Sequence, residues 1–432
     1  MSRSWFRSLR TLIVALGLMP GLTAAADAQP FGHDNITAYG ANGFDTGDDW
    51  QAIQNAVNAI PPGGRGAIYI PAGRFLLSNT LNVQGRSVEF RGEGQGISKL
   101  VWYAGWNGIQ YGSSAQPDNT AQDTLTVRSL SLLRSNSSGG AAITATWPKQ
   151  RQYMWHGNGG VATALIHDVH ISSDPWPSPG EGSYWWFGIQ LFNATTAKIS
   201  VFNIHGGSDN TGVAAIQLDG APALPDWPGG IPPPPDVNPY GKSIAVYIRD
   251  GSISKYVRGL EAKSWSEGIH FNNIDIRETS WGAWFVNRSG STVLSNCFIQ
   301  SRVRGILLEH GGITVAHSTI QQYLDTDFAG IELMNVNPSA PNEPIFGTVF
   351  TGNTIDSPGG GTQPRNGIVL NGNVDLSIVQ NNTIHNMHRG IWIINGTFDA
   401  QENMVVGNLI RGWTIGGVVD GGVNTRQADN VW

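Results

Sequence analysis

The residues best suited to chemistry lie at fixed offsets from a glycine–apolar dipeptide that recurs through the middle of the sequence. Two of them are carboxylates, Asp219 and Glu261, which fall in neighbouring copies of this phrase. Two carboxyl groups about 5–5.5 Å apart can serve as acid and nucleophile in cleavage of a glycosidic bond. The mutual repulsion of such a pair raises one pKa and so provides the acid. We therefore predict Asp219 and Glu261 as catalytic residues.

Three cations, Arg258, Lys263 and Arg304, occur in the same part of the repeat and suggest a second chemistry. Positive charges can neutralise a substrate carboxylate, which makes the proton on the neighbouring carbon easier to remove. Lys263, Tyr256 or an arginine would then act as the base. We predict the three cations as catalytic residues as well.

Aromatic and polar side chains near these positions are predicted to bind a substrate. Exposed rings offer a large contact area at low entropy cost and can stack on a flat ligand. The predicted binding residues are Gln217, Trp185, Trp227, Trp281, Trp284 and Glu309. Plainer interpretations compete, because aromatic loops could pack on one another or between subunits. The charges could also be ordinary surface pairs that contribute little, such as Glu261 with Lys263 or Glu309 with Arg304.

The elements that must position these residues follow from a 23-residue repeat. Its clearest copies place an isoleucine six positions before a glycine, at Ile253/Gly259, Ile276/Gly282 and Ile299/Gly305. Short β-branched runs broken by Gly, Asn and Ser are typical of strands. Two or three such strands per repeat predict a parallel β-helix, in which each repeat forms one coil and stacked coils share one core. The isoleucines and Cys297 are predicted inside, and the asparagines of a recurring N-x-I phrase at left-handed turns.

Alternate residues of a strand share a face, so the residue two positions after each glycine is predicted to point outward. Stacking the coils then gives three outer rows. The first row is Gln190, Gln217, Glu261, Trp284, Leu307, Glu332, Val369 and Trp392; the second, two positions further on, is Phe192, Asp219, Lys263, Val286, Glu309, Met334, Asn371 and Ile394; the third, before the glycine, is Phe187, Ala214, Arg258, Trp281, Arg304, Ala329, Asn366 and Arg389. Coils stack about 4.8 Å apart, so Asp219 and Glu261 should lie one diagonal step apart. A slip of one residue would reverse the inner and outer faces.

The first 28 residues have the pattern of a signal peptide. Arg3, Arg7 and Arg10 precede an apolar stretch at 11–22, which is followed by the small-residue text AAADAQ. This apolar run is shorter than the roughly 20 residues of a membrane-spanning helix. We therefore predict cleavage after Ala28 and a secreted or periplasmic protein without a membrane partner.

The segment that follows predicts a capping helix for the first coil, whose open strand edge needs cover. Its helical stripe consists of Ile53, Ala56, Val57 and Ile60. Thr46 or Asp48 would cap the start of this helix. We interpret Asp45, Asp48 and Asp49 as parts of the cap rather than as calcium ligands.

Three stretches of this region, AYGANGFDTGDDWQAIQNAV, AIYIPAGRFLLSNTLNV and VEFRGEGQG, carry a family resemblance. Residues 36–92 resemble the opening of exported pectate-lyase-like right-handed β-helix proteins. The resemblance implies an all-β fold, a single-stranded right-handed parallel β-helix (solenoid) with a short N-terminal capping helix, and a substrate bound along one sheet. Hydrolase relatives would show N-T-D, D-D and G-H-G signatures. The nearest text, IHGGSD at 204–209, does not match them, so no residue role is carried over.

We divide the chain into the signal peptide at 1–28, the cap and first coils at 29–92, and the β-helix at 93–432. Four stretches interrupt the repeat and are predicted to be loop insertions, at 147–160, 173–186, 220–241 and 335–346. Insertions into a repeat usually lie on the binding face.

Composition narrows the function of these 432 residues. The content of 56 glycines and only 13% charged residues is unlike that of a disordered chain. The net charge of −6, with 26 Lys and Arg in total, shows no clustered basic surface for nucleic acid. One cysteine allows no internal disulfide.

We predict an exported enzyme that cleaves a polysaccharide, a uronate-containing one by β-elimination, because three cations line the inferred face. A glycoside hydrolase or transferase that uses Asp219 and Glu261 is one alternative, and a non-catalytic glycan-binding protein is another. No cofactor or metal is required by this prediction, and calcium and a homotrimer are left open.

Overall fold

The computed structural model describes residues 33–113, 123–135, 138–147, 163–174, 183–207, 212–220, 243–263, 266–286, 291–335, 345–359, 362–394 and 401–432. These residues belong to one structural unit, 33–432. The predicted signal peptide, Trp227 and most of the four predicted insertions lie outside the described residues. No helix in the described part is long and apolar enough to span a bilayer.

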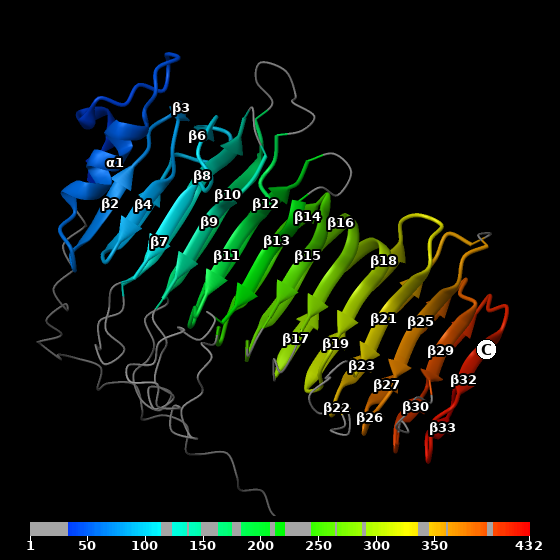
Figure 1. Cartoon of the computed structure of the whole chain (residues 1–432). Coiled ribbons are helices and arrows are strands. Elements are labelled where there is room, and N and C mark those ends of the chain that lie inside the picture. Colours follow the sequence, from blue (N-terminus) through cyan, green and yellow to red (C-terminus); the bar gives the residue numbers. More distant parts are fainter. Residues whose placement is uncertain are drawn as a thin grey trace, which may run out of the picture. The chain divides into compact units, whose positions relative to one another are not determined.

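Parallel strands wind into coils, and successive coils add strands to three ladders. Ladder 1 faces the reader in Figure 1. It consists of β4 (Leu81–Gln84), β7 (Ile109–Gly112), β9 (Ala141–Thr146), β11 (Phe187–Phe192), β13 (Gly212–Asp219), β15 (Tyr256–Ala262), the last parts of β16 (His270–Phe285) and β18 (Phe298–Leu308), β21 (Phe328–Met334), β25 (Arg365–Asn371), β29 (Arg389–Ile394) and β32 (Gly416–Asp420).

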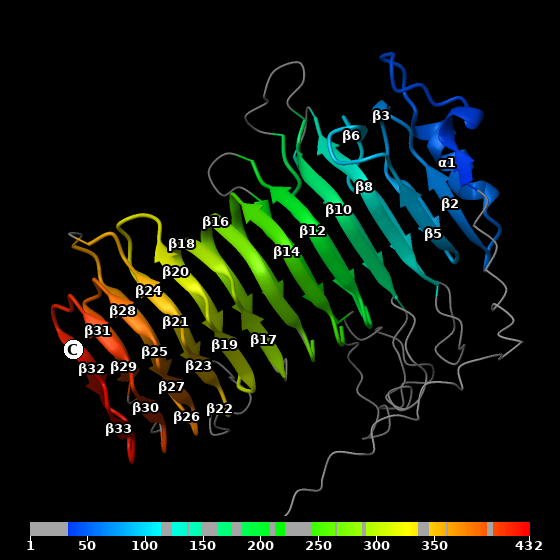
Figure 2. The same cartoon turned by 180° about the vertical axis from the view of Figure 1, so that it is seen from behind.

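Ladders 2 and 3 form the other sides of the coils, several strands of which are seen in Figure 2. Ladder 2 consists of β1 (His33–Asn35), β2 (Arg65–Tyr69), β5 (Ser87–Arg91), the first parts of β8 (Leu125–Arg134), β10 (Ala164–Ser173), β12 (Lys198–His205), β14 (Tyr247–Ser254) and β16, then β17 (Thr292–Ser295), β19 (Ile313–Ala316), β23 (Val349–Thr351), β27 (Ile378–Gln380), β30 (Met404–Val406) and β33 (Arg426–Ala428).

Ladder 3 consists of β3 (Gly73–Leu77), β6 (Ser98–Trp102), the later parts of β8, β10, β12 and β14, the middle of β16, the first part of β18, β20 (Thr319–Gln322), β24 (Thr354–Asp356), β28 (Thr383–His385) and β31 (Leu409–Arg411). A small separate sheet pairs β22 (Ile345–Phe346) with β26 (Val374–Asp375). The predicted parallel β-helix is thus confirmed.

A residue in the left-handed backbone region separates ladder 2 from ladder 3 in every coil from β8 onward. These residues are Ser129, Asp168, Val201, Asp250, Asn273, Asn296, His317, Gly352, Asn381, Gly407 and Asp429, with φ of 50–66°. The prediction put the asparagines of the N-x-I phrase at such positions, and the structure corrects this by one residue. The left-handed residue comes first, and the asparagine that follows it is buried. Asn353 donates to Asn382, and Asn382 to Asn408, each at 3.0 Å between Nδ2 and Oδ1.

The glycine of the repeat makes room for an isoleucine of the next coil. A Cβ atom added to Gly282 would come within 2.2 Å of Ile299 Cγ2, and one added to Gly305 within 2.3 Å of Ile320 Cγ2. Both isoleucines are fully buried. The fixed six-residue offset therefore reflects contact between ladder 3 and ladder 1 inside the coil stack. Cys297 is also buried, which confirms its predicted place in the core.

The capping helix α1 (Trp50–Ala59) and the short 3-10 helix η1 (Ile36–Tyr39) lie at the first end of the coil stack (Figure 1). Ile53, Ala56 and Val57 are fully buried, as the stripe predicts. The N-cap residue is Asp49, whose side chain makes no capping hydrogen bond, while Asp48 Oδ1 accepts from the backbone N–H of Trp50 at 3.2 Å. The predicted capping helix is therefore confirmed, but neither Thr46 nor Asp48 is its N-cap residue.

Candidate active site

The predicted outer rows exist on ladder 1 in the predicted register. In the first row, Gln217, Glu261 and Trp284 occupy equivalent positions on β13, β15 and β16. In the third row, Arg258 on β15 is equivalent to Trp281 on β16. The stacking of coils therefore brings an acid, a cation and two indoles from sequence-distant segments to one place on the outer face.

Glu261 is the centre of this cluster, and its side chain is completely buried. Its Oε1 accepts from Arg258 at 2.6 Å and lies 3.3 Å from Lys263 Nζ, while its Oε2 accepts from Gln217 Nε2 at 2.6 Å. Gln217 accepts in turn from Gln190 at 2.6 Å. A buried carboxylate needs such partners because desolvation of a lone charge is costly. The interpretation of Glu261 and Lys263 as a solvated surface pair is therefore wrong.

Arg258 also lies against two indole rings. Its guanidinium carbon is 4.2 Å from the ring centroid of Trp284 and 5.4 Å from that of Trp281. The two rings meet edge to face with centroids 5.0 Å apart. Both tryptophans are half-buried, so part of each ring is open to the outer face. Cation–π contact thus fixes an apolar surface on which a ring-shaped ligand can stack.

Glu309, in the second outer row, adjoins the same indole. Its Oε1 accepts from Trp284 Nε1 at 2.9 Å. Burial raises the pKa of the Glu309 carboxyl, and the hydrogen bond from Trp284 opposes this rise. A carboxyl group with a raised pKa is suited to act as a general acid. The predicted substrate-binding role of Glu309 stays a prediction. The raised pKa of its carboxyl also makes Glu309 able to donate a proton to a ligand.

Arg304 pairs with Glu332 rather than with Glu309, which corrects the surface pair considered from the sequence. Its Nε donates to Glu332 Oε2, and its Nη1 lies 4.0 Å from Asp327. Glu332 is in the first outer row, and its side chain is 11% exposed. Glu309 lies two residues beyond Leu307, the register partner of Glu332. Strand geometry places the two acids roughly 8 Å apart between Cα atoms.

Asp219 keeps its predicted place in the second outer row on β13, and it is half-buried. The proposed partner, Glu261, has both oxygens engaged by neighbouring side chains. All three predicted cations are likewise ion-paired, to Glu261 or to Glu332. Catalytic roles for these five residues stay predictions. Their contacts point to Glu261 as a positioning residue that holds Arg258 and Lys263 in place.

Two aromatic predictions are wrong because the side chains are in the core. Trp185 was expected to be an exposed loop ring, but it is completely buried and packs edge-on against Trp102 with centroids 5.6 Å apart. It cannot stack on a substrate. Tyr256 is also completely buried, and burial raises its pKa, so it is unsuited as a base. Trp227 lies outside the described residues.

Three residues of the outer rows were not selected from the sequence although the rows contained them. Glu332 pairs with Arg304, as described above. Arg389 and Trp392 form a second cation–indole contact, with the guanidinium carbon 4.2 Å from the ring centroid. The signal was present in the row pattern, but the prediction stopped at the central coils.

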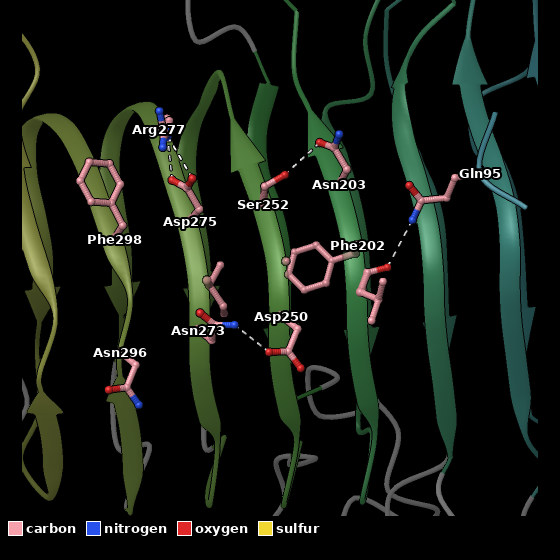
Figure 3. Close-up of a pocket in the computed structure, with 13 residues that line it drawn as sticks. Gln95, Phe202, Asn203, Asp250, Ser252, Asn273, Asp275, Arg277, Asn296 and Phe298 are labelled. Carbon is pink, nitrogen blue, oxygen red and sulfur yellow. Dashed lines mark hydrogen bonds and ion pairs between the residues drawn. The ribbon is translucent and has the colours of Figure 1, made fainter.

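A separate groove of about 690 Å³ lies where ladders 2 and 3 meet at the left-handed turns (Figure 3). Its polar side chains bind one another across neighbouring coils or along one strand. Asn273 donates to Asp250 at 2.8 Å, and Arg277 donates to Asp275 at 2.8 Å. None of the predicted site residues lines this groove. The predicted chemistry and this groove are therefore on different sides of the coil.

Two family models match the sequence one after the other. The model described as rhamnogalacturonase A/epimerase, pectate lyase-like, matches residues 34–175. The model described as periplasmic copper-binding protein (NosD) matches residues 239–431. Within the described ranges, no group of three or more His, Cys, Asp or Glu side chains could hold a metal ion. A comparison with curated proteins found no match.

Three solved structures show the likeness of fold. The catalytic unit of the GH87 α-1,3-glucanase from Streptomyces thermodiastaticus strain HF3-3 is 14% identical, with a TM-score of 0.54 over 95% of this chain and 70% of that one. A GH87 α-1,3-glucanase catalytic domain in complex with tetrasaccharides is 11% identical, with a TM-score of 0.58 over 96% and 71%. The N-terminal fragment of bacteriophage Phi29 gene product 12 is 14% identical, with a TM-score of 0.50 over 90% and 65%.

The family matches cover the cap with the first coils and the second half of the coil stack. The chain is therefore similar to pectate-lyase-like and NosD proteins, each over less than half of its length, and it has the parallel β-helix fold predicted from its sequence.

Proposed function

We propose that the protein is an exported enzyme that cleaves a polysaccharide bound along the outer face of ladder 1. The observation that carries this proposal is the contact between Glu309 and Trp284, in which an acid with a raised pKa adjoins a partly exposed indole. The indole can hold a sugar ring by stacking, and the acid can protonate the oxygen of the leaving sugar. A solved protein of similar fold that binds tetrasaccharides supports the choice of ligand.

The contacts favour hydrolysis over β-elimination. Elimination needs cations that are free to neutralise a substrate carboxylate, whereas the three central cations are paired with carboxylates of the chain itself. Glu309 and Glu332 lie on adjacent coils of the same face, with their Cα atoms roughly 8 Å apart by strand geometry. In inverting glycosidases the two carboxyl groups are about 6.5–9.5 Å apart, so that a water molecule fits between base and sugar, and two acids on adjacent coils of one face are the pair that this mechanism requires.

We assign Glu309 the role of acid and Glu332, held by Arg304, the role of base that activates this water. Arg304 Nε donates to Glu332, which orients the carboxylate from the side of β18. Glu261 acts at a distance, because it holds Arg258 and Arg258 lies against the ring of Trp284. The expected β-elimination by Lys263 or an arginine remains the competing mechanism.

The test is turnover by the chain from Gln29 onward on neutral α-glucans and on uronate-containing polysaccharides. Reducing ends and the ultraviolet absorbance of unsaturated products are followed in parallel. We expect reducing ends without absorbance. Glu309→Gln should lower kcat by about 10²–10⁴-fold, the usual contribution of a general acid.

Glu402→Gln is the matched control, because Glu402 is an exposed acid beside β30 on another side of the coil. It should leave kcat unchanged. A rise in absorbance together with reducing ends would show that the reaction is an elimination and would overturn the proposed hydrolysis. Glycan binding without turnover of any substrate would overturn the proposed enzymatic activity and indicate a glycan-binding protein.

A further inference from the structure

The outer face of ladder 1 carries a second cation–indole pair near its C-terminal end. Arg389 and Trp392 lie on β29, among the last strands of the stack (Figure 1). The guanidinium carbon is 4.2 Å from the ring centroid of Trp392, the same distance as between Arg258 and Trp284. Trp392 is four coil steps from Trp284 in the same outer row. Four steps correspond to about 19 Å along the face.

The two pairs differ in what neutralises the arginine. Arg258 is ion-paired with Glu261, which follows it by three positions on the same strand. Trp392 takes that position after Arg389. Among the described residues, no carboxylate lies within 4 Å of Arg389, and its hydrogen-bond partner is Asn366 Oδ1 at 3.3 Å. A guanidinium has five N–H donors, so Arg389 retains donors for a ligand.

The positive charge of Arg389 affects a neighbouring titratable group, His388. The pKa of His388 is lowered, first by burial and then by the positive charges of Arg365 and Arg389, while Asp325 acts in the opposite direction. Arg365 is buried beside Ser357, to which it donates at 3.0 Å. Because Arg365 is buried, an anion placed on this part of the face would contact Arg389.

We propose that Arg389 and Trp392 form a subsite for an anionic sugar unit of the bound polysaccharide. Arginine binds planar carboxylates with two parallel hydrogen bonds, and it accepts a sulfate ester by the same donors. Trp392 is half-buried, so its open surface can contact the sugar ring. The subsite rests on the proposed function only for the statement that the ligand is a glycan. It adds that the glycan carries negative charges, and that the C-terminal coils recognise them.

The experiment is calorimetric titration of the chain from Gln29 onward with three oligosaccharides at low ionic strength. They are an oligogalacturonate, a sulfated dextran fragment and a neutral α-1,3-glucan fragment. Arg389→Gln should weaken binding of the anionic ligand about tenfold or more, as expected for loss of charge-assisted hydrogen bonds. It should leave the neutral ligand unaffected. The stronger of the two anionic ligands identifies a carboxylate or a sulfate as the group recognised.

Arg411→Gln is the matched control, because Arg411 is exposed at the end of β31 on ladder 3. It removes the same charge from the same end of the stack and should leave all three affinities unchanged. Arg389→Lys keeps the charge without the planar fork and should fall between wild type and Arg389→Gln. Equal unfolding midpoints of the variants would show that each is folded.

Unchanged anionic binding in Arg389→Gln, equal loss in Arg411→Gln, or no anionic binding by the wild type would each overturn the subsite. These outcomes are separable from failure of the proposed function. Turnover with unaltered binding in Arg389→Gln overturns the subsite alone. Weaker binding in Arg389→Gln, with no turnover by the wild type, overturns the cleavage alone.

Discussion

The central and the C-terminal coils of ladder 1 each carry an arginine–indole contact. They differ in whether a carboxylate of the chain neutralises the arginine. In each, an arginine before a glycine lies 4.2 Å from an indole ring. Three positions after the arginine, the central coil has Glu261 and the C-terminal coil has Trp392. One position of the repeat thus decides whether the positive charge is neutralised inside the protein or remains open to a ligand.

This difference separates two kinds of surface. In the central coils, a fully buried carboxylate is surrounded by three donors, so its partners are held in fixed places. Such a network stabilises only while it is complete, because removal of one partner leaves a buried group unpaired. In the C-terminal coils, Arg389 has an amide as its polar partner. We therefore expect loss of Glu261 to change stability and loss of Arg389 to change binding.

The largest effect should follow Glu261→Ala, which deprives Arg258 and Lys263 of their shared carboxylate. We expect a loss of about 3 kcal/mol in the free energy of unfolding, the lower end for a broken buried pair. The lower end applies because the two cations are 21% and 32% exposed and can be partly rehydrated. Urea unfolding measures this loss.

Asn366→Ala is the control in the C-terminal coils, since it removes the polar partner of Arg389 without leaving a buried charge. It should cost about 1 kcal/mol or less. If Glu261→Ala lowers the free energy of unfolding no more than Asn366→Ala does, the proposed difference between the central and C-terminal coils is contradicted. Should Glu261→Ala fail to fold, Glu261→Gln gives the same comparison, because it keeps the volume and removes the charge.

A second test introduces a carboxylate beside Arg389, at the position that Glu261 occupies relative to Arg258. Trp392→Glu places a carboxylate three positions after Arg389, as Glu261 stands to Arg258. The new ion pair should neutralise Arg389. Anionic oligosaccharides should then bind about tenfold more weakly than to Trp392→Gln, which loses the indole without adding a charge. Calorimetry compares the two variants. Equal affinities would mean that the free charge of Arg389 does not bind the ligand.

Much of the outer face of ladder 1 could be predicted because each sequence repeat forms one coil, so equivalent positions of successive repeats lie in one row. Glycines at fixed offsets mark where an isoleucine of the next coil enters, as at Gly282 and Ile299. That contact locks the register, so the row containing Gln217, Glu261 and Trp284 followed from spacing alone.

The state of the outward side chains could not be predicted in the same way. Alternation says which face a residue is on, but not that Glu261 and Glu332 are buried on the outer face by their surroundings. Nor does it choose Glu332 over Glu309 as the partner of Arg304, which depends on side-chain conformation. Trp185 was misplaced because it stands in an interruption of the repeat, where no period assigns a face.

The smallest expected effect is a pH dependence in the central coils that originates at Glu309. Because burial raises its pKa, the folded chain binds this proton more tightly than the unfolded chain does. The stability of the wild type should therefore fall as pH rises from the unfolded value, about 4.3, through the raised folded value. Glu309→Gln does not ionise, so its stability relative to the wild type should be greatest at neutral pH and shrink on acidification.

Urea midpoints of both proteins between about pH 4 and about pH 7 measure this trend. Arg411→Gln is the control, since it removes no carboxyl group and its difference from the wild type should be flat. A Glu309→Gln difference that is constant with pH, or that grows toward acid, would contradict the raised pKa. It would also remove the reason for choosing Glu309 as the acid, because a raised pKa is what suits a carboxyl group to protonate a leaving sugar.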